Sequence, residues 1–172
     1  MTSTGPVLAR PGLPPVIDAS TRVLILGSFP GEASLAAGQY YAHPRNHFWP
    51  LLAALLRVPL VELAYRKRLL ELKRHHVGLW DIIVRCTRAG SADSAIRDAL
   101  HGDIAIAQRR TKVLQLVCFN GKTAGQAEPR WRAAGYSTRV LPSSSPAYTM
   151  PFADKLAAWR AALAGTETHV QP

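Results

Sequence analysis

The sequence predicts an α/β fold in which a parallel β-sheet is covered by helices on both faces. Short apolar runs rich in β-forming residues recur along the chain and end in polar loops, as residues 23–26 and 113–119 illustrate. Segments with helical spacing of apolar residues separate these runs. Because 172 residues match the usual size of one domain, we expect a single domain over residues 1–172.

Local patterns predict the individual elements. Proline and glycine crowd residues 1–15, so this segment is expected to be an irregular lead-in, and residues 166–172 are expected to form a tail. Apolar runs predict strands at 23–26, 79–84, 113–119 and 138–141. Helical patterns predict one helix from Asn46 with Pro50 in its first turn, and further helices at 60–76, 94–100, 122–134 (interrupted or restarted at Pro129) and 151–164.

The composition narrows the class of protein. The chain contains 21 Lys and Arg against 11 Asp and Glu, a net charge of +10, which favours a polyanionic partner such as nucleic acid. Basic residues within 66–74 are expected to form a solvated helix face, with long-range attraction of DNA as the alternative. The two cysteines, Cys86 and Cys118, exclude a disulfide framework and any four-cysteine zinc or iron–sulfur site, and are expected to be inert core thiols. No apolar run has the length of a membrane span or the form of a signal peptide, so we expect a soluble, cytoplasmic protein.

Three loops that follow predicted strands are expected to meet at one edge of the sheet. They are residues 27–31, 120–123 and 142–146. Parallel sheets bind ligands at the carboxyl ends of their strands. In the first loop Gly27 and Gly31 flank a prolyl turn, so a ligand can approach backbone N–H groups there; an ordinary strand-to-helix turn is the alternative interpretation.

The second loop, Asn120-Gly121-Lys122-Thr123, matches part of a phosphate-binding P-loop. The full pattern requires glycine where Leu116 stands, which disfavours a nucleoside triphosphatase. A helix that opens at Lys122 is still suited to hold one backbone phosphate, and a solvated lysine after an Asn-Gly turn is the alternative. In the third loop, small hydroxyl residues beside prolines are suited to follow a nucleic-acid backbone, or form a plain serine-rich loop.

Aromatic rings, histidines, an amide and an arginine crowd residues 40–49. Phe48 and Trp49 are expected to pack in the core. The site candidates in this segment are one of Tyr40 or Tyr41, together with His43 and Asn46. His43 and His47 have the spacing of a zinc pair, but no HExxH glutamate accompanies them, so His47 is expected to be structural and no metal is expected.

Four segments carry a family resemblance: GSFPGEASLAAGQYYAHPRNHFW, GLWDIIVRCTRAGSADSAI, FNGKTA and LPSSSPA. Over about residues 12–159 the chain resembles the uracil-DNA glycosylase superfamily, most closely its hypoxanthine-DNA glycosylase branch, called family six. The patterns AHPxNxFW and xNGKTA also occur in the mismatch-specific uracil or thymine glycosylases. The resemblance implies a three-layer αβα sandwich with a central four-stranded, mainly parallel sheet.

The resemblance also implies an activity. We expect a monofunctional DNA glycosylase of base excision repair that hydrolyses the N-glycosidic bond of deaminated bases, hypoxanthine first and uracil second. The enzyme is expected to act as a monomer on DNA, without metal or cofactor. Two alternatives remain open: a uracil- or mismatch-specific glycosylase, and a nucleic-acid-binding protein of the same fold that has lost turnover, motivated by Phe29 and Tyr148.

The resemblance assigns roles to several loop residues. The asparagine of HPxN, here Asn46, positions the attacking water, because Phe29 stands where mismatch-specific relatives carry the water-positioning asparagine of GINPG. His43 is expected to hold the base or Asn46. The first loop, consisting of Gly27, Ser28, Phe29, Pro30 and Gly31, is expected to bind the base, with the backbone N–H groups around Ser28 and Phe29 as donors to a base carbonyl. Phe29 or Tyr40 is expected to stack on the ring of the base.

Contacts to the DNA backbone are expected from the neighbouring loops. The candidates are Arg45, Asn120, Gly121, Lys122, Ser143, Ser144, Ser145 and Pro146. Tyr148 or Met150 is expected to be a wedge that fills the vacated base stack, and Tyr148 stands where relatives carry the asparagine of SPANA. Asp81 is expected to pair with Arg85 or Arg88 for structural reasons rather than to serve the site.

Overall fold

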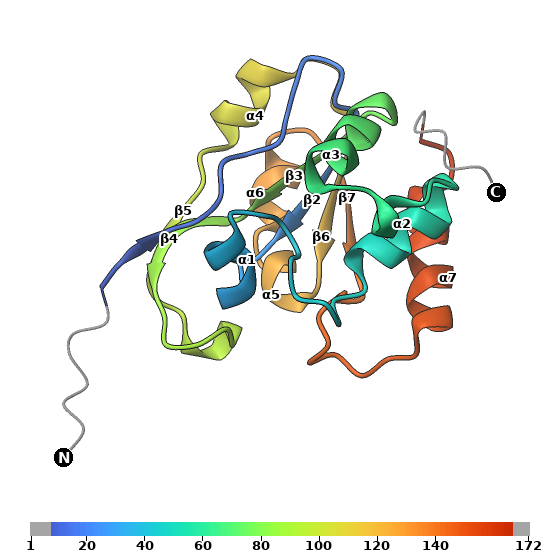
Figure 1. Cartoon of the computed structure of the whole chain (residues 1–172). Coiled ribbons are helices and arrows are strands. Elements are labelled where there is room, and N and C mark those ends of the chain that lie inside the picture. The colour runs from blue at the N-terminus through green and yellow to red at the C-terminus, as the bar shows by residue number, and fades with distance from the viewer. Residues whose placement is uncertain (1–7, 167–172) are drawn as a thin grey trace.

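Four parallel strands form the centre of the computed structural model, which describes residues 8–166 (Figure 1). They are β2 (Val23–Gly27), β3 (Val77–Asp81), β6 (Leu116–Asn120) and β7 (Ser137–Leu141), in the order β3-β2-β6-β7. Every neighbouring pair is parallel. The carboxyl ends of all four strands therefore lie along one edge of the sheet. The predicted four-stranded parallel sheet is confirmed.

Helices cover both faces of this sheet because side chains alternate between the two faces of each buried strand. In β2, Val23 and Ile25 belong to one core cluster, and Leu24 and Leu26 belong to the other. The first face is covered by α2 (Phe48–Leu56), η1 (Leu60–Glu62), α3 (Tyr65–Arg74) and α7 (Phe152–Leu163). The second face is covered by α1 (Glu32–Ala37), α4 (Ile104–Arg110), α5 (Lys122–Gly125) and α6 (Glu128–Ala133). The fold is thus a three-layer αβα sandwich.

A second, antiparallel sheet lies beside the parallel one (Figure 1). It contains β1 (Arg10–Pro11), β4 (Ile83–Thr87) and β5 (Arg97–His101), in the order β1-β4-β5. The single strand predicted over 79–84 is therefore wrong, because β3 ends at Asp81 and β4 begins at Ile83 in the other sheet. The chain changes sheets at Ile82, whose N–H donates to the carbonyl oxygen of Gly27 at 2.8 Å.

Two further predictions about the segments around this sheet are wrong. The helix predicted over 94–100 is instead η2 (Asp93–Ala95) followed by β5, whose residues are all exposed. Because this segment buries no apolar stripe, packing does not favour a helix, and pairing with β4 satisfies its backbone. The predicted irregular lead-in over 1–15 contains β1, and the N–H of Gly12 donates to the carbonyl oxygen of Val84 at 2.8 Å. The rest of that prediction, residues 1–7, lies outside the described range.

The remaining helix predictions differ from the structure mainly at boundaries. The helix expected from Asn46 begins at Phe48, and the one expected over 60–76 divides into η1 and α3. The helix expected over 122–134 divides into α5 and α6, and Pro129 lies in the first turn of α6, where a missing N–H costs no hydrogen bond.

The sequence patterns do not predict α1 or α4. A local signal for α4 exists, since the carboxylate of Asp103 caps its first turn by accepting the N–H of Ala105 at 2.9 Å. Of the tail predicted over 166–172, only Thr166 lies in the described range. No helix between residues 8 and 166 is long and apolar enough to cross a membrane.

A glycine in β3 provides a test of this packing. A Cβ at Gly78 would lie 2.8 Å from Cγ2 of Thr21 and 2.9 Å from the carbonyl oxygen of Val16. We expect Gly78→Ala to lower the free energy of unfolding by about 1–3 kcal/mol, measured by urea denaturation. Adding Thr21→Ser removes the Cγ2 contact and should restore part of the loss. Unchanged stability of Gly78→Ala would contradict the close packing of this strand.

Candidate active site

A cavity of about 430 Å³ opens at the carboxyl edge of the parallel sheet. Its walls bring together most of the residues that the sequence singles out: Gly27, Ser28, Phe29, Pro30, Gly31, Tyr40, Tyr41, His43, Asn46, Asn120, Ser143, Ser144, Ser145, Pro146 and Tyr148. The parallel register explains the convergence, because Gly27 pairs with Asp81 and Asn120 pairs with Leu141 at the strand ends. The volume is in the range of small-molecule sites.

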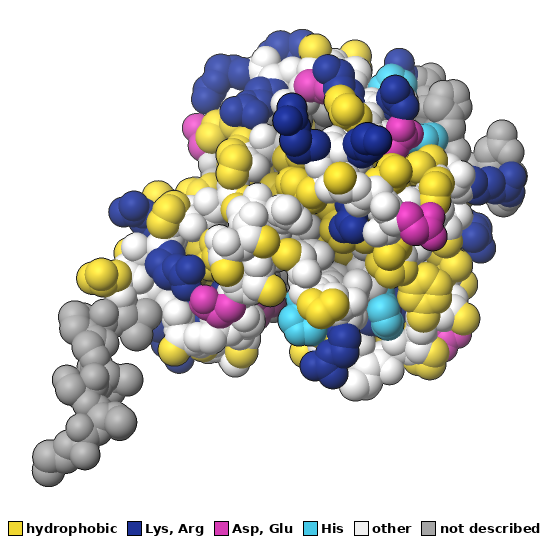
Figure 2. All heavy atoms as spheres, in the orientation of Figure 1, with side chains coloured by type: hydrophobic (Ala, Val, Ile, Leu, Met, Phe, Trp, Pro, Cys, Tyr) yellow, Lys and Arg dark blue, Asp and Glu magenta, His cyan; other side chains and the backbone are white. Residues whose placement is uncertain are grey.

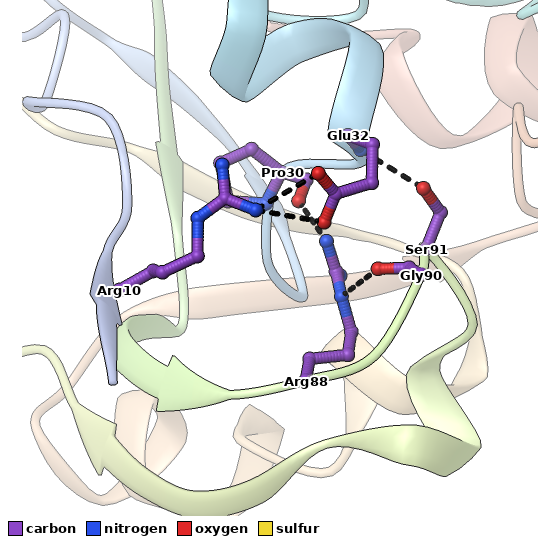
Figure 3. Close-up of polar contacts among 6 residues, drawn as sticks. All are labelled: Arg10, Pro30, Glu32, Arg88, Gly90 and Ser91. Carbon is purple, nitrogen blue, oxygen red and sulfur yellow. Dashed lines mark hydrogen bonds and ion pairs between the residues drawn. The ribbon is translucent and has the colours of Figure 1, made fainter. Parts of the chain in front are cut away.

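The first loop, residues 27–31, is held by the segment that follows β4. Figure 3 shows Arg88 reaching under this loop: its Nη2 donates to the carbonyl oxygen of Pro30, and its Nε donates to that of Gly90 at 2.8 Å. The N–H of Glu32 donates to Oγ of Ser91 at 2.9 Å. The loop is therefore tied to a segment far away in the sequence.

Two more contacts fix the same loop. The Arg10 guanidinium and the Glu32 carboxylate form an ion pair at 2.8 Å, which joins β1 to the start of α1 (Figure 3). Oγ of Ser28 donates to Oδ1 of Asp93 at 2.7 Å. Sequence reasoning does not assign Ser91 or Asp93 to the site, although both lie in the quoted segment GLWDIIVRCTRAGSADSAI. Their long separation from the loop hides this role.

The two candidates for stacking on a base, Tyr40 and Phe29, differ in their surroundings. Tyr40 is 3% exposed, and its hydroxyl donates to the carbonyl oxygens of Leu13 and Pro14 at 3.2 and 2.9 Å. It therefore anchors the segment before β2. Phe29 is 7% exposed, and the Arg88 guanidinium carbon lies 5.0 Å from its ring centroid. Phe29 also lines the cavity and, unlike Tyr40, has no polar group engaged elsewhere, so it is the better candidate.

Asn46 lies in a tight turn at the start of α2. Its Oδ1 accepts the N–H of Phe48 at 2.9 Å, and its own N–H donates to the carbonyl oxygen of His43 at 3.0 Å. Nδ1 of His43 accepts the N–H of Arg45 at 3.1 Å. These bonds hold His43 and Asn46 together in one wall of the cavity. Asn46 still has a second lone pair on Oδ1 and an amide NH₂.

The Ser143–Ser145 loop is joined to the end of β6. Nδ2 of Asn120 donates to Oγ of Ser144 at 2.8 Å, and the N–H of Ser144 donates to Oδ1 of Asn120 at 2.9 Å. The N–H of His47 donates to the carbonyl oxygen of Ser144 at 2.9 Å, which ties this loop to α2. Asn120 therefore positions the loop as well as lining the cavity.

Helix α7 also holds this loop, through two contacts that the sequence does not predict. Lys155 is 0% exposed and its Nζ donates to the carbonyl oxygen of Ser145 at 3.3 Å. Burial lowers the pKa of Lys155. Burial and the nearby Lys155 also lower the pKa of His47, the residue expected to be structural. Nε1 of Trp159 donates to the carbonyl oxygen of Pro142 at 2.9 Å.

Basic residues lie outside the walls of the cavity. None of the described lining residues is Lys or Arg, and three of the predicted DNA contacts, Arg45, Gly121 and Lys122, are not in the lining. Arg45 and Lys122 are exposed, and they lie close in sequence to the lining residues Asn46 and Asn120. Figure 2 shows many Lys and Arg side chains over α3 and α4, in the upper part of that face. Among residues 8–166 no group of three or more His, Cys, Asp or Glu could hold a metal ion.

Asp81 lines the cavity, and the predicted structural ion pair with Arg85 or Arg88 is wrong. No ion pair joins Asp81 to either arginine, both of which lie in the described range, and its Oδ2 has no hydrogen-bond partner there. Burial raises the pKa of Asp81 to about 7, Asp93 adds to the increase, and Arg88 opposes it. Position 27, which pairs with Asp81, requires glycine, because a Cβ there would lie 2.5 Å from Oδ1 of Asp81.

Asp81 is expected to make stability depend on pH. Its pKa of about 7 in the folded protein exceeds the ordinary 3.8, so folding favours the protonated form. This contribution is complete below about pH 4 and is lost as pH rises through about 7. Relative to Asp81→Asn, which does not titrate, the native free energy of unfolding should fall by about 4 kcal/mol between about pH 4 and pH 8 in urea denaturation. Parallel curves for the two proteins would contradict this.

Comparisons with known proteins agree with this architecture. The family model described as Uracil DNA glycosylase superfamily matches residues 14–164. A hypoxanthine DNA glycosylase from Methanosarcina barkeri is 41% identical over 152 residues, 88% of this chain and 96% of the relative. Another, from Methanosarcina acetivorans, is 43% identical over 138 residues, 80% of this chain and 87% of the relative.

A solved structure is also similar. It is an NMR solution structure of a Methanosarcina acetivorans protein described as a candidate uracil DNA glycosylase, with a TM-score of 0.79 and 39% identity. The match covers 90% of this chain and 98% of that one. Sequence, fold and family model therefore agree over nearly the whole length: the chain belongs to the uracil DNA glycosylase superfamily.

Proposed function

We propose that this protein is a DNA glycosylase of base excision repair that removes hypoxanthine from DNA by hydrolysing its N-glycosidic bond. The observation that carries the proposal is the match to two relatives named hypoxanthine DNA glycosylase, 41% and 43% identical over most of both chains. The cavity adds support, because all four segments of family resemblance contribute residues to its walls. Uracil is the second candidate substrate, supported by the family model.

The base must leave the duplex to reach the cavity. Extrusion costs least for a mispaired or damaged base, and a hypoxanthine is such a base. The cavity of about 430 Å³ has room for a purine and is lined by Phe29 and the first loop. Phe29 is the proposed stacking residue, and the backbone N–H groups of Ser28 and Phe29 are the proposed donors to a base carbonyl.

Cleavage of the glycosidic bond leaves positive charge on the sugar and negative charge on the base. The electron pair of the bond goes to the departing base, water adds to the sugar carbon, and the proton that this water loses passes to solvent, which in turn protonates the base. Asn46 is the proposed water-positioning residue. A neutral amide is no strong base, so its contribution is orientation. The N–H of Phe48 supports this role, because its bond to Oδ1 of Asn46 fixes the amide in the cavity wall.

The rim of the cavity is proposed to bind the DNA backbone. The Ser143–Ser145 loop offers hydroxyl groups and backbone N–H groups to phosphates, and it is held by Asn120 and Lys155. Arg45 and Lys122 are exposed and are proposed to add charge from outside the cavity. Tyr148 is 44% exposed at the cavity wall, which suits a wedge that replaces the extruded base.

We infer that the enzyme is a cytoplasmic monomer, one domain over 1–172, and that it acts without metal or cofactor. Two considerations support the absence of a metal or cofactor. Hydrolysis of a glycosidic bond requires a positioned water and donors to the departing base, which side chains and backbone supply. The two cysteines, both buried and free, cannot build the four-cysteine cluster of the iron–sulfur branches.

Asn46 tests the proposed activity. In single-turnover reactions with oligonucleotides that carry one deoxyinosine or one deoxyuridine, alkaline cleavage at abasic sites measures excision. We expect the native protein to cleave at inosine and Asn46→Ala to be slower by about 100-fold or more. Asn46→Ser preserves an oxygen that can accept the N–H of Phe48 but lacks the amide, so it should be equally slow with near-native stability. Excision of uracil alone would move the protein to another branch, and no excision of either base would overturn the proposed function.

Gly27 tests the shape of the cavity. A Cβ there would lie 2.5 Å from Oδ1 of Asp81 and 3.0 Å from the Tyr41 hydroxyl, so Gly27→Ala must displace groups in the wall. We expect excision of hypoxanthine to slow by about 10-fold or more. Gly31→Ala is the matched control in the same loop, because its Cβ would make only an ordinary contact of 3.5 Å with Oγ of Ser91. Equal effects of the two variants would contradict the assignment.

A further inference from the structure

Asp81 is a buried acid in the cavity whose hydrogen bonds are incomplete. It is 5% exposed, and Oδ2 has no hydrogen-bond partner among residues 8–166. Buried polar oxygens without a partner are rare because each costs free energy of folding. Because Asp81 also lines the cavity, a bound ligand is the group that can complete its hydrogen bonds.

The groups around Asp81 favour its neutral form. Burial is the main cause of its raised pKa of about 7; the Asp93 carboxylate raises it further and the Arg88 guanidinium lowers it. Arg88 forms no ion pair with Asp81, and its Nη2 and Nε donate to the carbonyl oxygens of Pro30 and Gly90.

The remaining titratable neighbours do not supply a counter-charge. Burial and the nearby Asp81 raise the pKa values of Tyr40 and Tyr41, so both phenols are neutral. Glu32 and His43 also line the cavity, but the Glu32 carboxylate is paired with Arg10 and His43 is exposed. No lining residue that the structure describes carries the fixed positive charge that would stabilise an ionised Asp81.

We propose that Asp81 reads the extruded base in its protonated form: its O–H donates to the C6 carbonyl oxygen of hypoxanthine, and its carbonyl oxygen accepts the adjacent N1–H. The inference rests on the proposed function and adds a specificity-determining residue to it. Hypoxanthine presents an acceptor beside a donor on this edge, and a neutral carboxyl group presents the complementary pair.

Ionisation removes this match. A carboxylate has only acceptor atoms, so one of its oxygens would face the carbonyl oxygen of the base without a proton between them. Excision therefore requires the proton on Asp81, and the enzyme loses activity when that proton dissociates. Uracil carries the same pair of groups, C4=O and N3–H, so its excision should depend on the same proton.

The test is the pH dependence of single-turnover excision of hypoxanthine. The native rate should fall about tenfold per pH unit above a midpoint near pH 7. Asp81→Asn retains a donor and an acceptor that do not titrate, so its rate should stay flat over this range, although slower than native at about pH 6. Asp81→Leu has a similar shape but neither group, and should be slower than Asp81→Asn by about 100-fold at every pH.

Asp93→Asn is the matched control variant. It removes the negative charge that raises the pKa of Asp81, so the midpoint of the native fall should move to lower pH. A fall of the same size and midpoint in Asp81→Asn would overturn the inference, as would equal rates for Asp81→Asn and Asp81→Leu. Native excision with no dependence on pH between about 6 and 8 would also overturn it and leave the proposed function standing.

A measurement without substrate tests the role of Asp81 separately from the proposed glycosylase activity. The carboxyl carbon of Asp81 can be followed by ¹³C NMR in the native protein, with Asp81→Asn identifying the resonance. We expect a midpoint near 7, and a midpoint near the ordinary 3.8 would overturn the inference whatever the activity. Absence of excision at every pH would instead overturn the proposed function, and with it the reading of a base by Asp81.

Discussion

The parallel pairing of β2 with both β3 and β6 is the constraint on which the site depends. It places the end of β2 beside the end of β3, with Gly27 paired to Asp81, and it places the loop after β6 on the same edge. Residues that are 54 positions apart in sequence thereby share a wall of one cavity. The proposed chemistry depends on this register, because a parallel sheet brings loops from distant parts of the sequence together at one edge.

The local sequence predicts the centre of the fold well and its margins poorly. Buried strands such as β2 are apolar on both faces and need no distant partner to be recognised. By contrast, β5 has no buried residue, so its conformation is decided by pairing with β4 rather than by its own pattern. The run over 79–84 is apolar apart from Asp81 and predicts one strand, yet the chain changes sheets at Ile82 through a bond to Gly27 that the sequence does not display.

The candidate site, like the fold, contains residues that the sequence predicts and residues that only the structure reveals. Glycines, prolines and the crowded residues 40–49 mark loops that a sequence can identify. The residues that hold those loops, Arg88 and Lys155, are cations, and a basic composition leads one to place cations on the surface. The predicted ion pair of Asp81 is wrong for a related reason: two arginines follow this acid closely in the sequence, and only the structure shows that Arg88 bonds instead to the carbonyl oxygens of Pro30 and Gly90.

The attachment of the first loop to the segment after β4 has a consequence for local stability. The carbonyl oxygen of Pro30 depends on Arg88, which lies 58 residues away, beyond a strand whose partner β5 is exposed and paired with shifts in register. Segments with few buried contacts open before the rest of a protein. Opening of the small antiparallel sheet would therefore free the first loop, residues 27–31, while the parallel sheet stays folded, so that heating should loosen this wall of the cavity at a lower temperature than it unfolds the core.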